Sequence, residues 1–141
     1  MAATEKLYSP HLLALAVELA QYPANPALSL FGKAKSPTCG SVMSLYLETD
    51  NDGRICDIGL KTQACAVGQA ATAIFARHAK GKNVRDIDDM ISALDSWLND
   101  AGPIPEWSDL GIIAAAKDFP GRHGAIRLPW QAAYRALHSI I

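Results

Sequence analysis

Charge is scarce in this chain of 141 residues, since only 19% of the side chains are charged and the formal net charge is −1. A protein that holds nucleic acid or an anionic membrane surface by electrostatics needs a broad basic face. Lys33 and Lys35 make a local basic spot, which is too small for either task. The sequence therefore predicts that neither nucleic acid nor a membrane is a partner.

Long apolar runs are also missing. The stretch from Leu12 to Leu19 is about half the length that a membrane-spanning helix needs, and Glu18 interrupts it. The first residues lack the charged start, apolar core and small-residue cleavage site of a secretory signal peptide. Cysteine is rare, with three residues, and this odd number favours free thiols in a reducing compartment over a disulfide framework. We therefore expect a soluble, cytoplasmic protein.

Several sequence motifs of catalysis are absent as well. The chain has no glycine-rich phosphate loop, no Cys-x-x-Cys pair, no Gly-x-Ser-x-Gly and no His-Glu-x-x-His. These motifs are typical of nucleotide-binding proteins, thiol redox proteins, serine hydrolases and zinc proteases. We therefore expect that this protein is not an enzyme.

Apolar residues, in contrast, are plentiful and make up 50% of the chain. A chain of this length buries roughly 68–70% of its unfolded surface, so its core needs no disulfide for stability. The sequence contains no internal repeat, low-complexity tract or obvious linker. It therefore predicts a single domain over residues 1–141.

Two stretches of alternating apolar residues surround a strong turn signal. One face of the first stretch carries Ser41, Met43, Leu45 and Leu47. One face of the second stretch, Arg54–Lys61, carries Cys56, Ile58 and Leu60, so Cys56 is expected to point toward the core. The turn Asp50–Gly53 between them is typical of an antiparallel hairpin. A further short strand is expected within Gly32–Ser36.

Helical spacing of apolar residues predicts helices on both sides of this hairpin. The first helix is expected at about Ser9–Gln21, with Ser9 as its N-cap and Pro10 at its first position. Later helices are expected after Cys65, after Asn83, and over about Asp109–Lys117 and Leu128–Ile140. The predicted fold class is therefore α+β, with a small antiparallel sheet of about three strands packed against several helices.

Two cysteines stand in settings that suit sulfur or metal chemistry. Cys39 lies in the turn-like run Ser36–Gly40, where it is either a ligand or a small apolar side chain under a turn. Cys65 stands at a predicted helix start, and the helix dipole favours the thiolate form that binds metal or attacks sulfur. His123, in the predicted loop Gly121–Gly124, is the histidine with the best setting for a ligand.

The residues around these cysteines resemble a known family. The resemblance is carried by the segments Cys39–Leu45, Asp52–Ile55, Lys61–Ala66, Gly81–Lys82, Phe119–Arg122 and Leu128–Trp130. In type, order and spacing they are similar to the U-type iron–sulfur cluster assembly scaffolds, which include IscU, SufU and the N-terminal domain of NifU. The later segments resemble the SufU branch in particular.

The resemblance implies a site at one edge of the domain. There, three cysteines and an aspartate accept sulfur from a cysteine desulfurase and hold a nascent [2Fe-2S] cluster or zinc. Cys39 matches the first cysteine and Cys65 the second, so both are implied cofactor and metal ligands, and His123 is a further candidate metal ligand. Ser41 stands where the family has its aspartate, and Ala125 stands where it has its third cysteine. A single subunit therefore lacks the usual number of ligands.

Three hypotheses follow from this pattern. The first is a scaffold that binds an iron–sulfur cluster, iron or zinc through Cys39 and Cys65, with a homodimer joining two such pairs into a set of four thiolates. The second, its alternative, is a cluster-free module that docks a cysteine desulfurase or another iron–sulfur assembly protein. The third is a thiol enzyme or persulfide carrier that uses Cys65 alone. The first hypothesis is our prediction.

Overall fold

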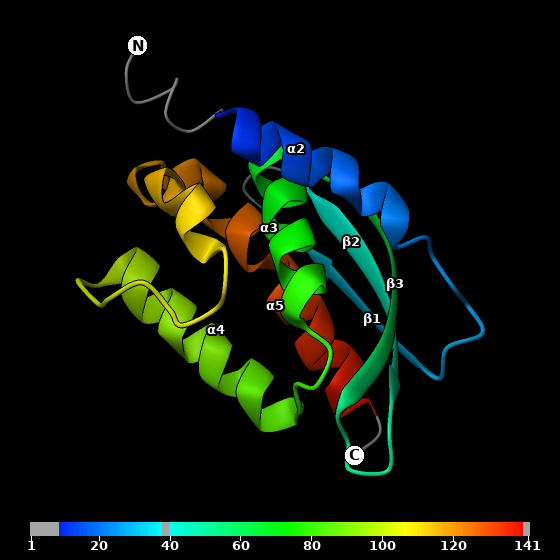
Figure 1. Ribbon diagram of the computed structural model, residues 1–141. Coiled ribbons are helices and arrows are strands. Elements are labelled where there is room, and N and C mark those ends of the chain that lie inside the picture. Colours follow the sequence, from blue (N-terminus) through cyan, green and yellow to red (C-terminus); the bar gives the residue numbers. More distant parts are fainter. Residues whose placement is uncertain (1–8, 38–39, 140–141) are drawn as a thin grey trace.

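The computed structural model describes residues 9–37 and 40–139, and it contains a three-stranded sheet flanked by helices (Figure 1). The main elements are α2 (Pro10–Glu18), β1 (Leu30–Lys35), β2 (Val42–Thr49), β3 (Ile55–Gln63), α3 (Ala66–His78), α4 (Val84–Asn99) and α5 (His123–His138). Three 3₁₀ segments complete the description: η1 (Leu19–Gln21), η2 (Leu110–Asp118) and η3 (Pro120–Arg122). The α+β class predicted from the sequence is confirmed.

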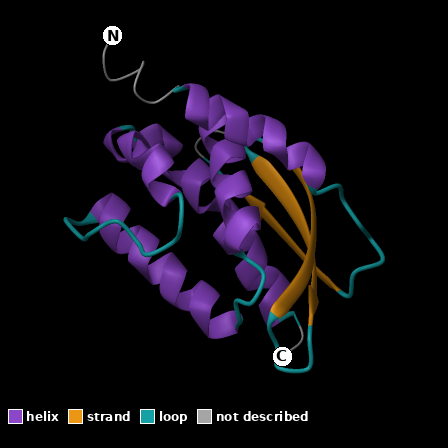
Figure 2. Cartoon of the chain, in the orientation of Figure 1, coloured by secondary structure: helices purple, strands orange, loops and turns teal. Residues whose placement is uncertain are grey.

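The three strands lie in the order β1-β2-β3, and both neighbouring pairs are antiparallel. The predicted hairpin is therefore confirmed, with Gly53 at a φ of 76° in its turn, a conformation that glycine adopts without strain. The helices lie on one side of the sheet (Figure 2). Helix α5 packs on β1 and β2, α3 contacts both α5 and α2, and α4 packs against α5.

Close contact between α5 and the sheet depends on one small residue, Gly32 in β1. A Cβ atom built on Gly32 would lie 2.1 Å from the carbonyl oxygen of Ala132 and 2.6 Å from the backbone nitrogen of Ala136. Such distances are far inside van der Waals contact, so the backbone of α5 occupies the space that a side chain would need. Glycine at this position therefore sets how near the last helix approaches the sheet.

An aromatic cluster fills the core on the helical side of the sheet. The rings of Phe75, Trp107 and Trp130 lie with their centroids 5.3–5.9 Å apart, in stacked and edge-to-face arrangements. The indole nitrogen of Trp107 donates a hydrogen bond of 3.0 Å to the backbone oxygen of Ile74, which ties the segment before η2 to α3.

No helix within the described residues is long and apolar enough to cross a membrane.

The predicted helix starts at Ser9 and Asn83 are confirmed by their capping contacts. The Ser9 hydroxyl accepts a hydrogen bond from the backbone nitrogen of Leu12, and Pro10 occupies the first turn of α2. The Asn83 side chain accepts from the backbone nitrogen of Asp86, whose carboxylate accepts in return from the Asn83 nitrogen. This reciprocal pair satisfies two donors at the start of α4.

The prediction that Cys56 points into the core is wrong. Glu48 pairs with Asp57 and Thr49 pairs with Ile55, so the register shifts and Cys56 is an extra residue on β3. A β-bulge of this kind breaks the period of two. Ile55 is therefore buried along with Ile58 and Leu60, whereas Cys56 is exposed.

Three further boundaries differ from the predicted ones. Strand β1 begins at Leu30, which precedes the predicted Gly32. The segment expected as a helix from Asp109 is the 3₁₀ segment η2, in which Ile113 departs from helical angles. Helix α5 begins at His123, well before the predicted Leu128, and Pro129 lies inside it. The helix tolerates this proline because Ala125, Ile126, Leu128 and Trp130 around it are fully buried.

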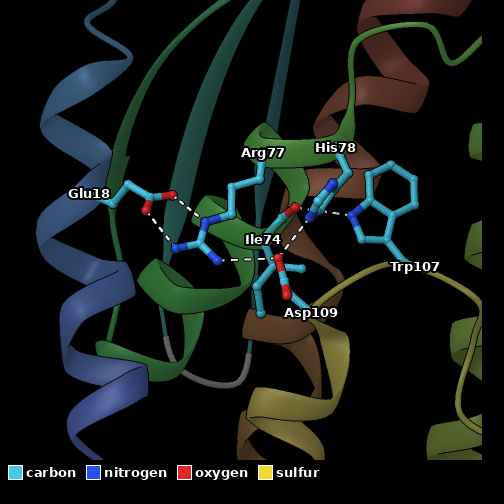
Figure 3. A network of polar contacts seen from close by, with 6 residues as sticks. All are labelled: Glu18, Ile74, Arg77, His78, Trp107 and Asp109. Atoms are coloured by element: carbon cyan, nitrogen blue, oxygen red, sulfur yellow. Dashed lines mark hydrogen bonds and ion pairs between the residues drawn. The ribbon is translucent and has the colours of Figure 1, made fainter.

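A polar network fastens α2 and η2 to the end of α3 (Figure 3). The Arg77 guanidinium donates two hydrogen bonds, of 2.6 and 2.7 Å, to the Glu18 carboxylate and a third, of 3.2 Å, to Asp109. His78 contacts the same Asp109 carboxylate at 2.7 Å. Hydrogen bonding by Arg77 lowers the pKa of Glu18, and hydrogen bonding by His78 and then Arg77 lowers the pKa of Asp109.

This network predicts a loss of stability in acid. A carboxyl group whose pKa is depressed by folding stabilises the fold above its unfolded pKa, and that contribution disappears as the pH falls through the folded value. We therefore expect the free energy of unfolding to decline as the pH falls below about 4.5, the ordinary value for Glu18. Arg77→Gln should lower the free energy of unfolding by about 1 kcal/mol at neutral pH, a small loss because exposed ion pairs are screened by solvent. The free energy of unfolding of this variant should also change less as the pH falls.

Urea unfolding between pH 3 and 7, followed by tryptophan fluorescence, measures the free energy of unfolding at each pH. For small domains this free energy falls by about 1–3 kcal/mol per M of urea. Arg85→Gln is the matched control, since Arg85 is an exposed arginine on α4. Equal unfolding curves for the Arg77 and Arg85 variants at every pH would contradict the prediction.

Candidate functional site

One end of the sheet gathers the segments that carry the predicted ligands. Val42, at the start of β2, pairs with Gln63, at the end of β3, and the Thr62 hydroxyl donates to the Val42 oxygen at 3.1 Å. The two ends of the loop between β1 and β2 meet here, because the Ser36 nitrogen donates to the Ser41 oxygen at 2.8 Å. Cys65 follows two residues after Gln63. Cys39 lies outside the described residues.

Cys65 occupies the N-cap position of α3, as the sequence predicted. Its backbone is extended, with φ −66° and ψ 170°, and its side chain is half-buried. The Gln69 nitrogen donates to the Cys65 oxygen at 2.9 Å, and the Gln69 side chain donates to the Ala64 oxygen at 2.8 Å. Among the described residues, the Cys65 thiol makes no capping hydrogen bond. The backbone on both sides of Cys65 is therefore held in place while its sulfur keeps its bonding capacity.

Ala125 lies directly against the first turn of α3. A Cβ atom built on Gly68 would lie 2.8 Å from the Ala64 Cβ and 3.3 Å from the Ala125 Cβ, and Ala125 is fully buried. The position matched to the family's third cysteine is thus beside the residues that surround Cys65. A methyl group in place of a thiol leaves this position without a ligand atom.

His123 makes a contact that takes one of its nitrogens out of any ligand set. It is the first residue of α5 rather than a loop residue, and its Nε2 lies 2.7 Å from the Lys117 backbone oxygen. Because a carbonyl oxygen only accepts, Nε2 must carry the proton of this hydrogen bond. Nε2 of His123 therefore joins α5 with η2, and only Nδ1 keeps a lone pair that could bind a metal.

The described donors do not complete a metal site within one chain. No group of three His, Cys, Asp or Glu side chains suited to a metal ion occurs among residues 9–37 and 40–139. Ser41, in place of the family's aspartate, is buried with 4% of its surface exposed, and its hydroxyl is a weaker ligand than a carboxylate. Cys56 is on the bulge at the other end of β3. This end of the sheet therefore offers one described thiol, that of Cys65, and further ligands would come from position 39, from Nδ1 of His123 or from another chain.

Sequence reasoning missed two residues that shape this end of the molecule. Gly68 lets Ala125 approach the first turn of α3, and Gln69 fixes the backbone before the helix. The available signal was a glycine in the first turn of a helix, where it costs roughly 1 kcal/mol relative to alanine and so indicates a close contact.

Comparison with known proteins gives one family and one fold. The model of the family described as NifU-like N terminal domain matches residues 21–124. The crystal structure of the N-terminal NifU-like protein from Brucella abortus is 24% identical, with a TM-score of 0.89 over 98% of this chain and 96% of that chain. FiSufU from Fervidobacterium islandicum AW-1 is 21% identical, with a TM-score of 0.80 over 94% of this chain and 98% of that chain.

Sequence relatives cover a shorter stretch. The iron–sulfur cluster assembly scaffold protein IscU of Haemophilus influenzae is 33% identical over 55 residues, which are 39% of this chain and 44% of that protein. The chain spans less than half the length of the curated relatives it matches. The likeness in sequence to these relatives therefore lies in a short stretch of the chain. The likeness in fold to the solved structures extends over nearly the whole chain.

Proposed function

This chain belongs to the NifU-like N-terminal domain family, and from that premise we propose that it is an iron–sulfur cluster assembly scaffold. Its cargo would be a nascent iron–sulfur cluster, with [2Fe-2S] as the expected type, or else iron or zinc. The ligands would be Cys39 and Cys65. The observation that carries the proposal is the position of Cys65, which occupies the N-cap position of α3 near the sheet end where Ser36 pairs with Ser41. We place this function in the cytoplasm, where thiols stay reduced.

The shortage of ligands in one chain leads us to propose that two copies share the cargo. Cluster irons are normally held by four thiolates or by thiolates with imidazoles. Cys39 and Cys65 supply two sulfurs per chain, and a two-fold axis near this end of the sheet would bring a second pair beside the first. Such a dimer would form or tighten when the cargo binds.

Metal content and oligomeric state test this proposal together. We expect protein purified without oxygen to contain iron with sulfide, or zinc, at about one cluster per dimer. Cys39→Ser and Cys65→Ser should each lose it, because a serine oxygen is a poor ligand for these metals. Cys56→Ser is the matched control, since Cys56 is an exposed cysteine at the other end of β3 and should leave the metal content unchanged. Retained metal in both site variants would overturn the ligand assignment, and metal bound to a monomer would overturn the shared site.

A second function has its own observation. Ala125 supplies no sulfur, and Nε2 of His123 donates to the Lys117 oxygen. A module that has given up cluster binding would still dock a cysteine desulfurase or another assembly protein through the same end of the fold. Colourless, metal-free protein that resists reconstitution, and that captures a desulfurase equally well as wild type and as a Cys39→Ser/Cys65→Ser double variant, would favour this function over the scaffold.

A further inference from the structure

The face of the sheet that points away from the helices carries exposed charged side chains. Alternation along the strands turns one set of side chains away from the helices, and Figure 2 shows that no described helix lies across that side. The set that we call the outer sheet face consists of Phe31, Lys33, Lys35, Val42, Ser44, Tyr46, Glu48, Asp57, Lys61 and Gln63. Each lysine in it is exposed.

The strand register places two of these lysines on either side of one hydroxyl. Ser44 pairs with Lys33 on β1 and with Lys61 on β3. Adjacent strands lie roughly 4.8 Å apart, so the two lysine Cα atoms are about 10 Å apart, a span that their side chains can close onto a single carboxylate. A hollow of about 210 Å³ lies between them, lined by Lys33, Val42, Ser44, Lys61, Thr62 and Gln63.

Two carboxylates, those of Glu48 and Asp57, share this face with the three lysines and lie farther along the strands. Throughout the described residues, Lys33, Lys35 and Lys61 have no ion-pair partner. The Glu48 carboxylate, farther along β2, accepts hydrogen bonds from Ser29, and that of Asp57 accepts from the Ile58 nitrogen. Lysines on edge strands discourage unwanted strand pairing. That role needs charge alone and does not account for a hollow lined with hydroxyl and amide groups.

An apolar pair of side chains lies next to the lysines on the outer sheet face. Phe31 pairs with Tyr46 across the strands, their ring centroids are 5.1 Å apart, and 47% of Phe31 is exposed. Aromatic surface beside unpaired cations suits a ligand that carries both carboxylates and apolar groups. Three lysines on a chain of net charge −1 are too few for the dense phosphates of nucleic acid or of a membrane.

We propose that the outer sheet face docks an acidic segment of a partner protein, with carboxylates seated between Lys33 and Lys61 and an apolar side chain against Phe31. The observations that carry the proposal are the pairing of the two lysines with Ser44 in the strand register, the hollow between them and the neighbouring aromatic pair. None of the cysteines enters this argument, so the proposal is independent of cluster binding.

Titration of isotope-labelled full-length protein, followed by amide NMR shifts, tests the surface directly. The probe is a synthetic peptide of alternating glutamate and phenylalanine, and its counterpart carries lysine for glutamate. We expect saturable shifts at β1, β2 and β3 with the acidic peptide alone, weakening as salt rises. Lys33→Gln combined with Lys61→Gln should weaken binding roughly tenfold. Lys80→Gln, an exposed lysine beyond α3, is the single-charge control and should change affinity by less than about twofold.

Each other outcome overturns the proposal. These outcomes are the absence of saturable shifts, equal binding of the lysine peptide, and equal binding by the double variant. Saturation of the hollow by inorganic phosphate, with no added affinity from the peptide, would make it a site for small anions. Stronger shifts with anionic lipid vesicles or single-stranded RNA than with the peptide would assign the face to a different class of partner.

Discussion

Gly32→Ala is expected to destabilise the fold by about 3 kcal/mol or more, the upper range for overpacked positions. The added methyl group would lie 2.1 Å from the Ala132 oxygen and 2.6 Å from the Ala136 nitrogen. Both are backbone atoms of α5, so no side-chain rotation relieves the clash. The helix would have to move away from β1 and β2, which it covers, and the packing between them would open.

Urea unfolding, followed by circular dichroism, measures this loss as a lower midpoint or as failure of the variant to fold. Gly111→Ala is the matched control. Gly111 lies in η2, and a Cβ atom built there meets nothing within 4 Å among the described residues. The control should therefore be as stable as wild type or slightly more stable, because alanine restricts the unfolded chain. A Gly32→Ala variant with the midpoint of wild type would show that α5 adjusts freely over the sheet.

Ala125→Cys is expected to raise zinc affinity by at least about tenfold, because loss of even an outer-shell partner of a metal site typically costs 10–100-fold. Position 125 lies against Gly68, three residues after Cys65 in the first turn of α3. A thiol there would restore the ligand type that the family resemblance implies, within the same chain. The variant should also bind zinc as a monomer, since it would depend less on a second copy.

Competition with a chromogenic zinc chelator measures the affinity, and thermal unfolding without metal checks that the buried substitution still folds. Ala133→Cys is the matched control, because Ala133 is a fully buried alanine farther along the same helix. It should leave zinc affinity at the wild-type value. Equal gains in both variants would mean that an added thiol binds zinc without Cys65, and no gain at position 125 would separate that position from the site.

Much of the fold was predictable because local signals and tertiary structure agree. The hairpin follows from alternating residues around Asp50–Gly53, and the register keeps Met43, Leu45 and Leu47 on the buried face. The starts of α2 and α4 follow from Ser9 and Asn83, whose side chains accept hydrogen bonds from backbone nitrogens nearby in sequence. Helix caps and tight turns depend on three or four neighbouring residues, so they can be predicted from the sequence alone.

The failed predictions share a different cause. The bulge at Cys56 depends on how β3 pairs with a strand across the turn, so the period within β3 alone does not reveal it. Helix α5 continues through Pro129 because its buried face gains more from packing than the proline costs. His123 therefore lies in the helix, bonded to Lys117, rather than in a loop. In each case tertiary contacts outweighed the local preference.

The candidate site was predictable by residue type but not by geometry. Cys65 at a helix start was visible in the sequence, and its N-cap position is confirmed. The approach of Ala125 to Gly68 joins segments separated by α4 and η2, so spacing along the chain gave no measure of it. The match of Ala125 to the family's third cysteine rests on the family resemblance alone and stays a prediction.

The contact between Ala125 and Gly68 also sets an order of events during synthesis. Cys65 leaves the ribosome with the hairpin and α3, whereas the helix α5, which carries Ala125, is made only after α4 and η2. Contacts between distant segments form late because the intervening loop must first be closed. Until α5 docks on the sheet at Gly32, the first turn of α3 that follows Cys65 lacks its contact with Ala125. We therefore expect the surroundings of this helix start to be completed only when the last helix docks.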